Sequence, residues 1–182
     1  MTIRIIIDSY KRQLVRTKWQ NESSEPFLST NGVRQGGILS PLLFSVYNDI
    51  LLERLKQNGS GCWIGCTYFG ALSYADDLCI LSPSIKGLQD MLNVCDEFGQ
   101  EFDVLYNPKK TQCIRFSRQK NPACDSSLYL SCQKLQWVDN IKYLGNWITS
   151  TLSEDIEIKR KRGIFHGGVN NLSSCFGNVG YK

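Results

Sequence analysis

The segment Leu72-Ser73-Tyr74-Ala75-Asp76-Asp77-Leu78-Cys79-Ile80-Leu81 places two adjacent carboxylates between two apolar stretches of strand length. The apolar residues suit half-buried strands, and Ala75-Asp76-Asp77 suits the tight turn that would join them into a hairpin. Asp76 and Asp77 at such a tip repel each other, and a divalent cation relieves that repulsion. Hard oxygen ligands favour Mg²⁺ or Mn²⁺. Because an isolated Asp-Asp pair is also ordinary turn chemistry, the segment predicts the hairpin and leaves its role open.

The length and composition indicate one globular domain with an extension. A chain of 182 residues can bury one substantial core. The 42% hydrophobic and 21% charged residues exclude disorder over the whole chain. The net charge of +4 permits a polyanionic partner without requiring one. No apolar stretch approaches the length of a membrane span, and the apolar run near Met1 is too short for a signal peptide.

The eight cysteines do not indicate a disulfide framework. The chain is too long to need such cross-links, and Cys79 and Cys113 lie in apolar strand patterns, where cysteine behaves as a small hydrophobe. The spacings of the cysteines and of His166, the single histidine, match no paired zinc-ligand pattern. We therefore expect free thiols, a reducing intracellular location in the cytoplasm or the nucleus, and no membrane partner.

Hydrophobic periodicity predicts an α+β fold, an antiparallel sheet backed by two helices. We expect helices over residues 1–12, 41–56 and 84–101, and a last helix that begins at Glu154 after a capping Ser153. Ser40 and Pro41 suit the N-cap and first position of the second helix. The expected strands cover residues 14–19, 27–30, 62–70, the two arms of the carboxylate hairpin, 113–116, 128–130 and 141–148. Residues 62–70 and the hairpin would form three antiparallel strands.

The glycine-rich segment Asn31–Pro41 precedes the second expected helix. Its three glycines allow the backbone to approach a ligand closely. A loop that only opens a helix would explain Gly36, Gly37 and the Ser-Pro pair, but it would not explain Arg34-Gln35. We therefore favour a binding role for this segment.

Five segments, in this order, resemble the palm and early thumb of a reverse transcriptase of the non-LTR (LINE-type) retrotransposon kind. Gly32–Phe44 resembles the motif that contacts template and incoming nucleotide, and Tyr74–Asp77 resembles the catalytic hairpin. Asn107–Thr111 resembles the lysine motif, and Tyr143–Gly145 resembles the primer-grip region. The basic Lys159–Arg162 in the last expected helix resembles the start of the thumb, although a nuclear signal would have the same composition. Each segment alone is a weak signal; their common order makes it strong.

The resemblance implies nucleotidyl transfer by two-metal chemistry with Mg²⁺ or Mn²⁺ as the cofactor. It makes Asp76 the principal metal ligand and Asp77 an auxiliary one. Tyr74 would pack beside the primer terminus. Lys110 is the candidate for protonating or neutralising the pyrophosphate, and Lys109 is an equally charged neighbour. The implied partners are an RNA template, a DNA primer and deoxynucleoside triphosphates.

The resemblance also assigns the glycine-rich segment to the template and the nucleotide. Gln35 and the backbone at Gly36 would touch the nascent pair or the template strand, and Arg34 belongs to the same binding set. The alternative for this segment is a glycine loop that only opens the helix.

One part of the family's pattern does not occur in these 182 residues. The family's first catalytic aspartate lies upstream of the glycine motif, in a stretch of the form Asp-x-x-x-Ala-Phe-Asp. Asp8 is the only aspartate upstream of that motif here, and it follows Ile5-Ile6-Ile7. We expect Asp8 on a helix end rather than in the metal site, and we expect a chain truncated at its N-terminus.

The predicted organisation is a partial palm over 1–117, a linker over 118–127, and primer-grip-like strands with the start of a thumb helix over 128–182. The predicted function is that of a fragment of an RNA-directed DNA polymerase, inactive alone because the first catalytic aspartate is missing. The alternative is a non-catalytic nucleic-acid-binding remnant. The oligomeric state is not predicted.

Overall fold

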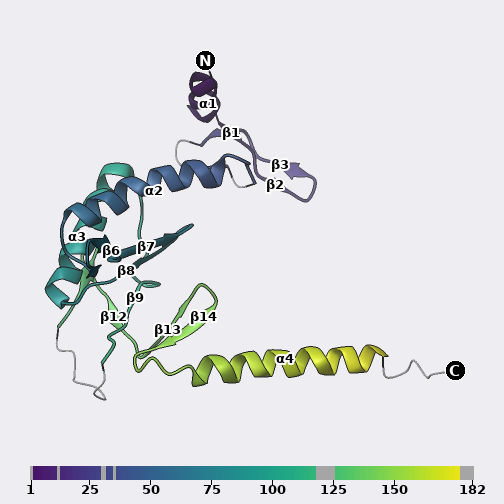
Figure 1. Cartoon of the computed structure of the whole chain (residues 1–182). Coiled ribbons are helices and arrows are strands. Elements are labelled where there is room, and N and C mark those ends of the chain that lie inside the picture. Colours follow the sequence, from purple (N-terminus) through teal and green to yellow (C-terminus); the bar gives the residue numbers. More distant parts are fainter. Residues whose placement is uncertain (1, 12, 30–31, 35, 118–125, 177–182) are drawn as a thin grey trace.

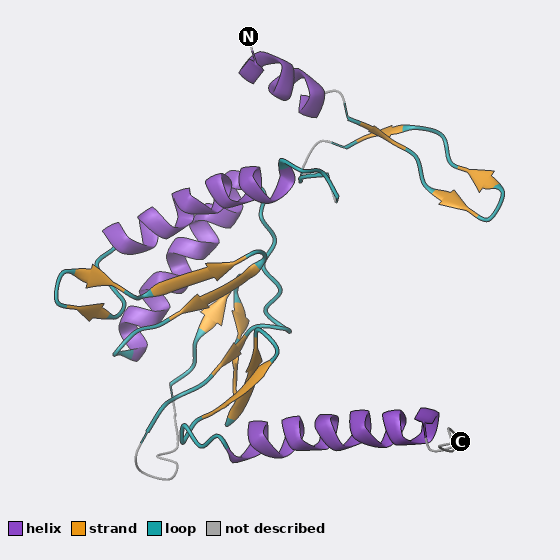
Figure 2. Cartoon of the chain, turned by 45° about the vertical axis from the view of Figure 1, so that its right-hand side comes forward, coloured by secondary structure: helices purple, strands orange, loops and turns teal. Residues whose placement is uncertain are grey.

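A computed structural model describes residues 2–11, 13–29, 32–34, 36–117 and 126–176 of the chain (Figure 1). The expected linker over 118–127 falls mostly outside the described residues. Helices α2 and α3 lie together on one side of a layer of short strands, and Figure 2 shows this layering most clearly. The α+β prediction is therefore confirmed.

The four helices of the described chain follow the predicted periodicity closely. Ser84, expected as the first residue of the third helix, is instead its N-cap, because its side chain accepts a hydrogen bond from the Gly87 amide. The predicted N-cap of α2 is wrong by one position, since Ser40 is the first helical residue and Leu39 precedes it without a side-chain cap. The last helix begins at Asp155, one residue later than predicted, and the Ser153 side chain accepts a hydrogen bond from the Asp155 amide at 3.3 Å. The helices are α1 (Thr2–Lys11), α2 (Ser40–Gln57), α3 (Ile85–Phe102) and α4 (Asp155–Phe176).

The strands of the described chain pair two by two rather than forming one sheet. The antiparallel pairs are β1 (Leu14–Val15) with β4 (Phe27–Leu28), β2 (Lys18–Trp19) with β3 (Glu22–Ser23), β5 (Trp63–Ile64) with β6 (Thr67–Tyr68), β7 (Ala71–Tyr74) with β8 (Asp77–Ile80), β10 (Tyr129–Leu130) with β11 (Gln133–Lys134), and β13 (Asn140–Tyr143) with β14 (Asn146–Thr149). The remaining pair, β9 (Gln112–Cys113) with β12 (Gln136–Trp137), is parallel.

Three strand predictions need correction. Residues 141–148, expected as one strand, form the β13–β14 hairpin, with Leu144 and Gly145 at its turn. Residues 62–70 form a second hairpin rather than a single strand, because Gly65 adopts a positive φ of 59° at the turn between β5 and β6. That hairpin still joins the carboxylate hairpin, since the Cys62 amide donates to the Leu81 carbonyl and the Leu81 amide donates to the Gly70 carbonyl. The expected all-antiparallel arrangement is also wrong for β9 and β12, which are parallel.

The core lies between α2, α3 and the strands that follow them. Leu55, Met91 and Phe98 are almost completely buried there, and the aromatic rings of Phe98 and Phe102 stack at 4.5 Å between centroids. Leu128 and Leu135 are buried in the same cluster. The core therefore includes residues from both sides of the 118–125 segment.

Two parts of the chain extend away from this core (Figures 1 and 2). One is α1 with the long hairpin arm of β1 to β4, in which the expected strands 14–19 and 27–30 pair only as β1 with β4, while β2 pairs with β3. The other is α4, whose described side chains are all at least partly exposed. Among the described residues, no helix combines the length and the apolar character needed to cross a membrane.

The described cysteines are free thiols. Cys95 and Cys113 are buried among apolar side chains, and Cys79 is half-buried. Burial, followed by the charge of Asp96, raises the pKa of Cys95 to about 12, and burial raises the pKa of Cys79 as well. Both groups are therefore uncharged at neutral pH and act as small hydrophobic side chains.

Candidate active site

The two adjacent carboxylates lie at the tip of the β7–β8 hairpin. Tyr74 and Asp77 face each other in its last pair, so Ala75 and Asp76 form a two-residue turn. Ala75 has a φ of +51°, a conformation that costs an L-residue about 1–2 kcal/mol. The side chain of Asn48 on α2 donates to the Ala75 carbonyl at 3.3 Å and holds the tip against that helix. The hairpin and its turn are confirmed as predicted.

Asp76 and Asp77 are both exposed, and neither forms a salt bridge in the part of the chain that the structure describes. Their oxygen atoms are therefore available to a hard cation. The described residues contain no cluster of three or more carboxylate, thiol or imidazole groups at this or any other place. The two carboxylates therefore fit part of a metal site, and they supply fewer protein ligands than a complete site would.

Tyr74 extends from the same hairpin and is 65% exposed. An aromatic ring this open beside two carboxylates can lie against a nucleotide or a strand terminus. Its position is compatible with the role that the resemblance implies.

Tyr143, at the end of β13, is influenced by charges on the carboxylate hairpin. Burial raises the pKa of Tyr143, and the charges of Cys79 and Asp77 raise it further. Tyr143 therefore lies within electrostatic reach of a predicted metal ligand. The sequence placed Tyr143 in the primer-grip motif without linking it to Asp77, since no local pattern reports a contact between residues 66 positions apart.

The glycine-rich segment is tied to α1 by Arg34. The Arg34 guanidinium donates to the Ser9 carbonyl at 3.0 Å, in the last turn of α1, and lies over the ring of Tyr10. A cation at this end of a helix complements its dipole. Ser40 donates to the Arg34 carbonyl at 2.6 Å and fastens the segment to the start of α2. The Arg34 side chain is thus engaged within the chain.

Glycine is required at positions 36 and 37 for different physical reasons. Gly36 has a φ of +81°, and a Cβ there would meet open space, so only the backbone conformation requires glycine. A Cβ on Gly37 would lie 2.6 Å from the Ser40 hydroxyl and would displace it. Gln35, the third predicted binding residue of the segment, lies outside the described residues.

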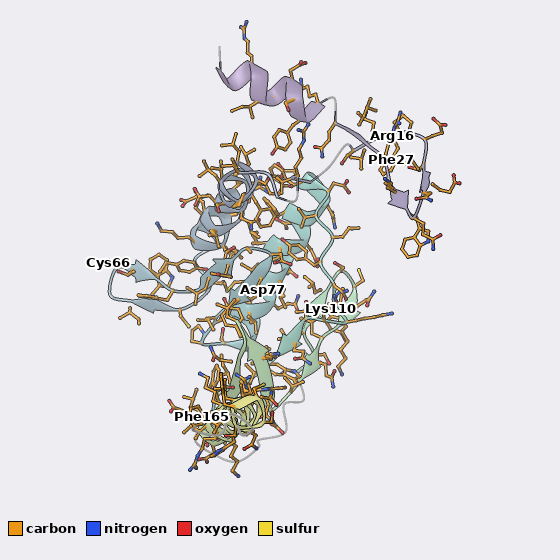
Figure 3. The ribbon with its side chains drawn as sticks, turned by 90° about the vertical axis from the view of Figure 1, so that its right-hand side faces the viewer. Arg16, Phe27, Cys66, Asp77, Lys110 and Phe165 are labelled. Atoms are coloured by element: carbon orange, nitrogen blue, oxygen red, sulfur yellow. The ribbon has the colours of Figure 1, made fainter. Side chains whose placement is uncertain are left out.

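The lysine loop is organised by Asn107, which sequence analysis did not select. Its side-chain oxygen accepts hydrogen bonds from the Lys109 and Lys110 amides at 3.1 and 3.3 Å, and its carbonyl accepts from the Lys110 and Thr111 amides. Both lysine side chains are exposed. Figure 3 shows Lys110 on the loop that leads into β9, below and to the right of Asp77. The signal that could have revealed Asn107 is the Asn-Pro start of the loop, which is typical of a turn whose side chain caps the backbone.

Replacing Asn107 by Ala should lower the free energy of unfolding by about 1 kcal/mol, because the Lys109 amide loses its acceptor and the Lys110 amide keeps only the Asn107 carbonyl. Urea denaturation followed by circular dichroism would measure the change. Asn170→Ala, at an exposed position of α4 without a comparable contact, is the matched control and should not lower stability. Equal stabilities of the wild-type chain and Asn107→Ala would contradict the capping role.

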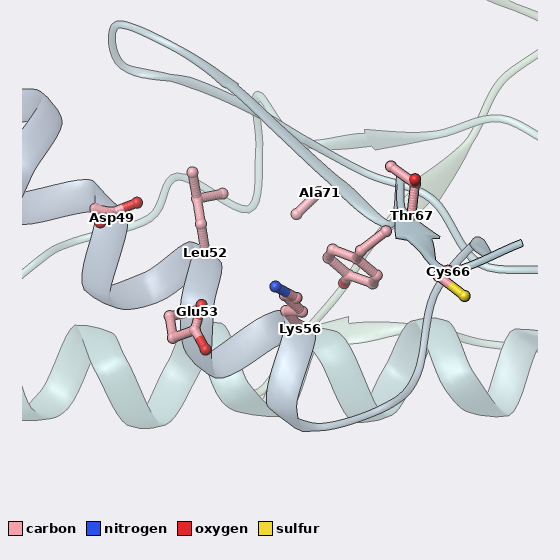
Figure 4. Close-up of a pocket in the computed structure, with 8 residues that line it drawn as sticks. Asp49, Leu52, Glu53, Lys56, Cys66, Thr67 and Ala71 are labelled. Atoms are coloured by element: carbon pink, nitrogen blue, oxygen red, sulfur yellow. The ribbon is translucent and has the colours of Figure 1, made fainter. Parts of the chain in front are cut away.

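A groove of about 320 Å³ opens on another part of the molecule, between α2 and the β5–β6 hairpin (Figure 4). Its lining residues are Asp49, Leu52, Glu53, Lys56, Cys66, Thr67, Tyr68 and Ala71. None of the predicted site residues lines it. The carboxylates therefore lie on an open surface rather than in this groove.

The structure brings Asp76, Asp77 and Tyr74 together on one hairpin. The glycine-rich segment lies at the start of α2, the helix that supports the hairpin tip through Asn48. Asp8 lies within α1 and is exposed, which agrees with the expectation of a helical position.

Comparison with known proteins gives one family and several relatives. A family described as "Reverse transcriptase (RNA-dependent DNA polymerase)" matches residues 1–148. A "Retrovirus-related Pol polyprotein from type-1 retrotransposable element R2" of Nasonia vitripennis is 43% identical over 83 residues, which are 46% of this chain and 8% of the relative. The type-2 element R2DM polyprotein of Drosophila melanogaster is 32% identical over 136 residues, 71% of this chain and 13% of the relative.

A third polyprotein, from a type-1 R2 element of Popillia japonica, is 28% identical over 154 residues, which are 80% of this chain and 25% of the relative. The chain therefore spans a quarter or less of the length of these relatives. The matched residues 1–148 include the glycine-rich segment, the carboxylate hairpin, the lysine loop and the first part of the β13–β14 hairpin.

Proposed function

Because the chain belongs to the reverse transcriptase family of the non-LTR retrotransposon kind, we propose that it carries the carboxylate hairpin of an RNA-directed DNA polymerase. Asp76 is the principal ligand of a divalent cation, and Asp77 is an auxiliary ligand. The observation that carries the proposal is the pair of exposed carboxylates on a strained turn that Asn48 holds in place.

The chemistry that this site serves is nucleotidyl transfer from a deoxynucleoside triphosphate to a primer 3′-hydroxyl. Bound Mg²⁺ or Mn²⁺ supplies activation of the hydroxyl and neutralisation of the pyrophosphate charge. Tyr74 packs against the primer terminus. Lys110 neutralises or protonates the departing pyrophosphate, since its exposed ammonium stands on a loop that Asn107 makes rigid.

The glycine-rich segment is the proposed place for the template and the nascent pair. Gln35 and the Gly36 backbone contact the template and the nascent pair. Arg34 supports this contact indirectly, because it joins the segment to α1. The proposed partners are an RNA template and a DNA primer, in an intracellular setting. In the proposed division, the palm covers 1–117, and the primer-grip strands and the first thumb helix follow the linker.

A non-catalytic role in binding nucleic acid is the second candidate, and the two-carboxylate donor set favours it. Such a chain would bind RNA through its net charge of +4 and would not bind metal at the hairpin. The two candidates therefore differ in what Mn²⁺ does at Asp76 and Asp77.

Manganese titration followed by nuclear magnetic resonance tests the proposed site. We expect paramagnetic broadening to appear first at residues 74–78 and to disappear in the Asp76→Asn, Asp77→Asn double variant. Glu154→Gln with Asp155→Asn is the matched control, because it removes another adjacent pair of exposed carboxylates. Broadening near residue 76 that persists in the hairpin variant would refute the metal site and favour the non-catalytic role.

A further inference from the structure

Helix α4 presents a stripe of exposed apolar side chains in the part of the chain that the structure describes. Side chains that recur every three, four or seven residues lie on one face of a helix. Those of the stripe are Ile158, Phe165, Val169, Leu172 and Phe176, and they are between 41% and 68% exposed. The β13–β14 hairpin is bound by Glu157 and Arg160, which lie on other faces of α4, so the stripe stays open.

The composition of α4 makes an uncovered helix unfavourable. Gly163, Gly167 and Gly168 lie in its interior, where glycine weakens a helix. A Cβ at any of the three would meet open space, so no contact with the described residues requires glycine there. Most of the stability of a helix in a protein comes from packing of its apolar face. We therefore expect a second apolar surface to cover the stripe.

Helix α2 offers such a surface on its outer face. Leu42, Val46 and Ile50 follow one another at intervals of one helical turn and are between 42% and 63% exposed. Asp49 and Glu53 lie on the same face, are exposed, and line the groove between α2 and the β5–β6 hairpin (Figure 4). The outer face of α2 is thus apolar in its first half and acidic further along.

The apolar parts of the two helices match when α4 lies antiparallel to α2. Both helices repeat their apolar side chains every three or four residues, so several pairs can meet in one alignment. The opposed pairs are Phe165 with Ile50, Val169 with Val46, and Leu172 with Leu42. One antiparallel alignment therefore covers most of the stripe of α4 and the whole apolar part of α2.

The charges favour the same antiparallel direction. The basic segment Lys159–Arg162 precedes the apolar part of α4, whereas the acidic residues of α2 follow its apolar part. In the antiparallel alignment Arg162 meets Glu53, and Lys56 comes within one turn of Asp155. A parallel alignment would instead place the basic segment of α4 against the apolar part of α2. Charge and apolar pattern therefore agree on one direction.

The two faces of one chain do not meet. Figures 1 and 2 both show the short strands between α2 and α4. Helix α4 is also held on the far side of these strands, because the Trp147 amide of β14 donates to Glu157 at 3.1 Å. The α4 stripe can therefore reach the outer face of α2 only on another molecule.

We propose that α4 of one copy of this chain packs antiparallel on the outer face of α2 of a second copy, so that the chain forms a dimer. The occupant of the α4 stripe is the surface of Leu42, Val46 and Ile50 in the second copy, and Arg162 pairs with Glu53 at the edge of the contact. The contact leaves Asp76 and Asp77 outside it and does not depend on the proposed function.

Sedimentation equilibrium of the full chain over a range of concentrations tests the contact. We expect a monomer at low concentration and a dimer at high concentration. Val169→Asp should weaken association by more than about tenfold, because a charge would then be buried among apolar side chains. Ile164→Asp is the matched control on the same helix. Ile164 is 61% exposed and lies outside the stripe, so its replacement should change association by less than about twofold.

Exchange of the two charges tests the pairing of Arg162 with Glu53. Glu53→Lys or Arg162→Glu alone should weaken association by about fivefold or more, because like charges then meet. The two changes together should restore association to within about threefold of the unchanged chain. Glu25→Lys, at an exposed position of the hairpin arm, changes the net charge equally and should leave association unchanged. Circular dichroism shows whether each variant stays folded.

Nuclear Overhauser measurements on a mixture of isotope-labelled and unlabelled chain detect contacts between copies. We expect such contacts between the methyl groups of Val46 and Val169. A chain that stays monomeric at every concentration would overturn the proposal, as it would if nucleic acid alone covered the stripe. Contacts between Val46 and Val169 within one copy would also overturn it.

A dimer that Val169→Asp and Ile164→Asp weaken equally would contradict the proposed contact, as would charge variants that the combined variant does not rescue. The manganese experiment at Asp76 and Asp77 changes none of these results, so the failure of the metal site and the failure of this contact can be distinguished. At concentrations at which the chain is a monomer Phe165 stays exposed, so its truncation alters association rather than the unfolding of the core.

Discussion

Primer extension by the purified 182-residue chain, on an RNA template with Mg²⁺ or Mn²⁺, should be undetectable. The described residues offer Asp76 and Asp77 without a third carboxylate beside them. Removing one group from a preorganised electrostatic site commonly lowers the rate by about a hundredfold or more. Two carboxylates also position the 3′-hydroxyl and the α-phosphate poorly, and poor positioning lowers the rate by a further large factor.

The measurement is elongation of an end-labelled DNA primer resolved on a denaturing gel. An intact polymerase of the same family in the same buffer is the positive control, and the Asp76→Asn variant of this chain sets the background. Processive extension by the unchanged chain that Asp76→Asn abolishes would contradict the expectation. Asp8, although exposed in α1, would then become the leading candidate for the third ligand.

Replacing Phe98 by Ala should lower the free energy of unfolding by about 3–5 kcal/mol. The Phe98 side chain is 1% exposed. Its ring stacks on Phe102 and meets the edge of Tyr47 at 5.7 Å between centroids, while the Arg54 guanidinium lies over it. Truncation would leave a cavity between α2 and α3 that these rigid neighbours cannot fill.

Guanidinium denaturation followed by circular dichroism would measure this loss. Phe165→Ala is the matched control, because Phe165 is 68% exposed on α4 and its removal should change stability by less than about 0.5 kcal/mol. Equal losses in the two variants would show that the packing of α2 on α3 does not form the stabilising core.

The sequence predicted best those helices and hairpins whose pattern lies within one short segment of the chain. The apolar residues of α3 recur at helical spacing, so this helix was predicted to within one residue at each end. The β7–β8 hairpin was predicted because a two-residue turn between apolar arms is itself a local pattern. The catalytic residues on that hairpin came from the family resemblance rather than from geometry.

Pairings between distant segments were not predicted. The parallel contact of β9 with β12 joins residues more than 20 positions apart, and two-residue strands carry too little periodicity to reveal a partner. The β5–β6 turn was missed because a glycine in an apolar run can equally belong to a strand. Asn48 was missed as a support of the hairpin tip for the same reason, since it binds a segment that lies far away in the sequence.

The positive φ of Ala75 restricts which amino acids can occupy the tip of the hairpin. A β-branched residue such as valine would crowd its own backbone in this conformation, whereas glycine would adopt it freely. Alanine lies between these extremes. Its positive φ carries some strain, and its methyl group restricts the backbone of the tip more than glycine would. Evolutionary substitution at position 75 should therefore follow backbone conformation first, even though its methyl group carries none of the proposed chemistry.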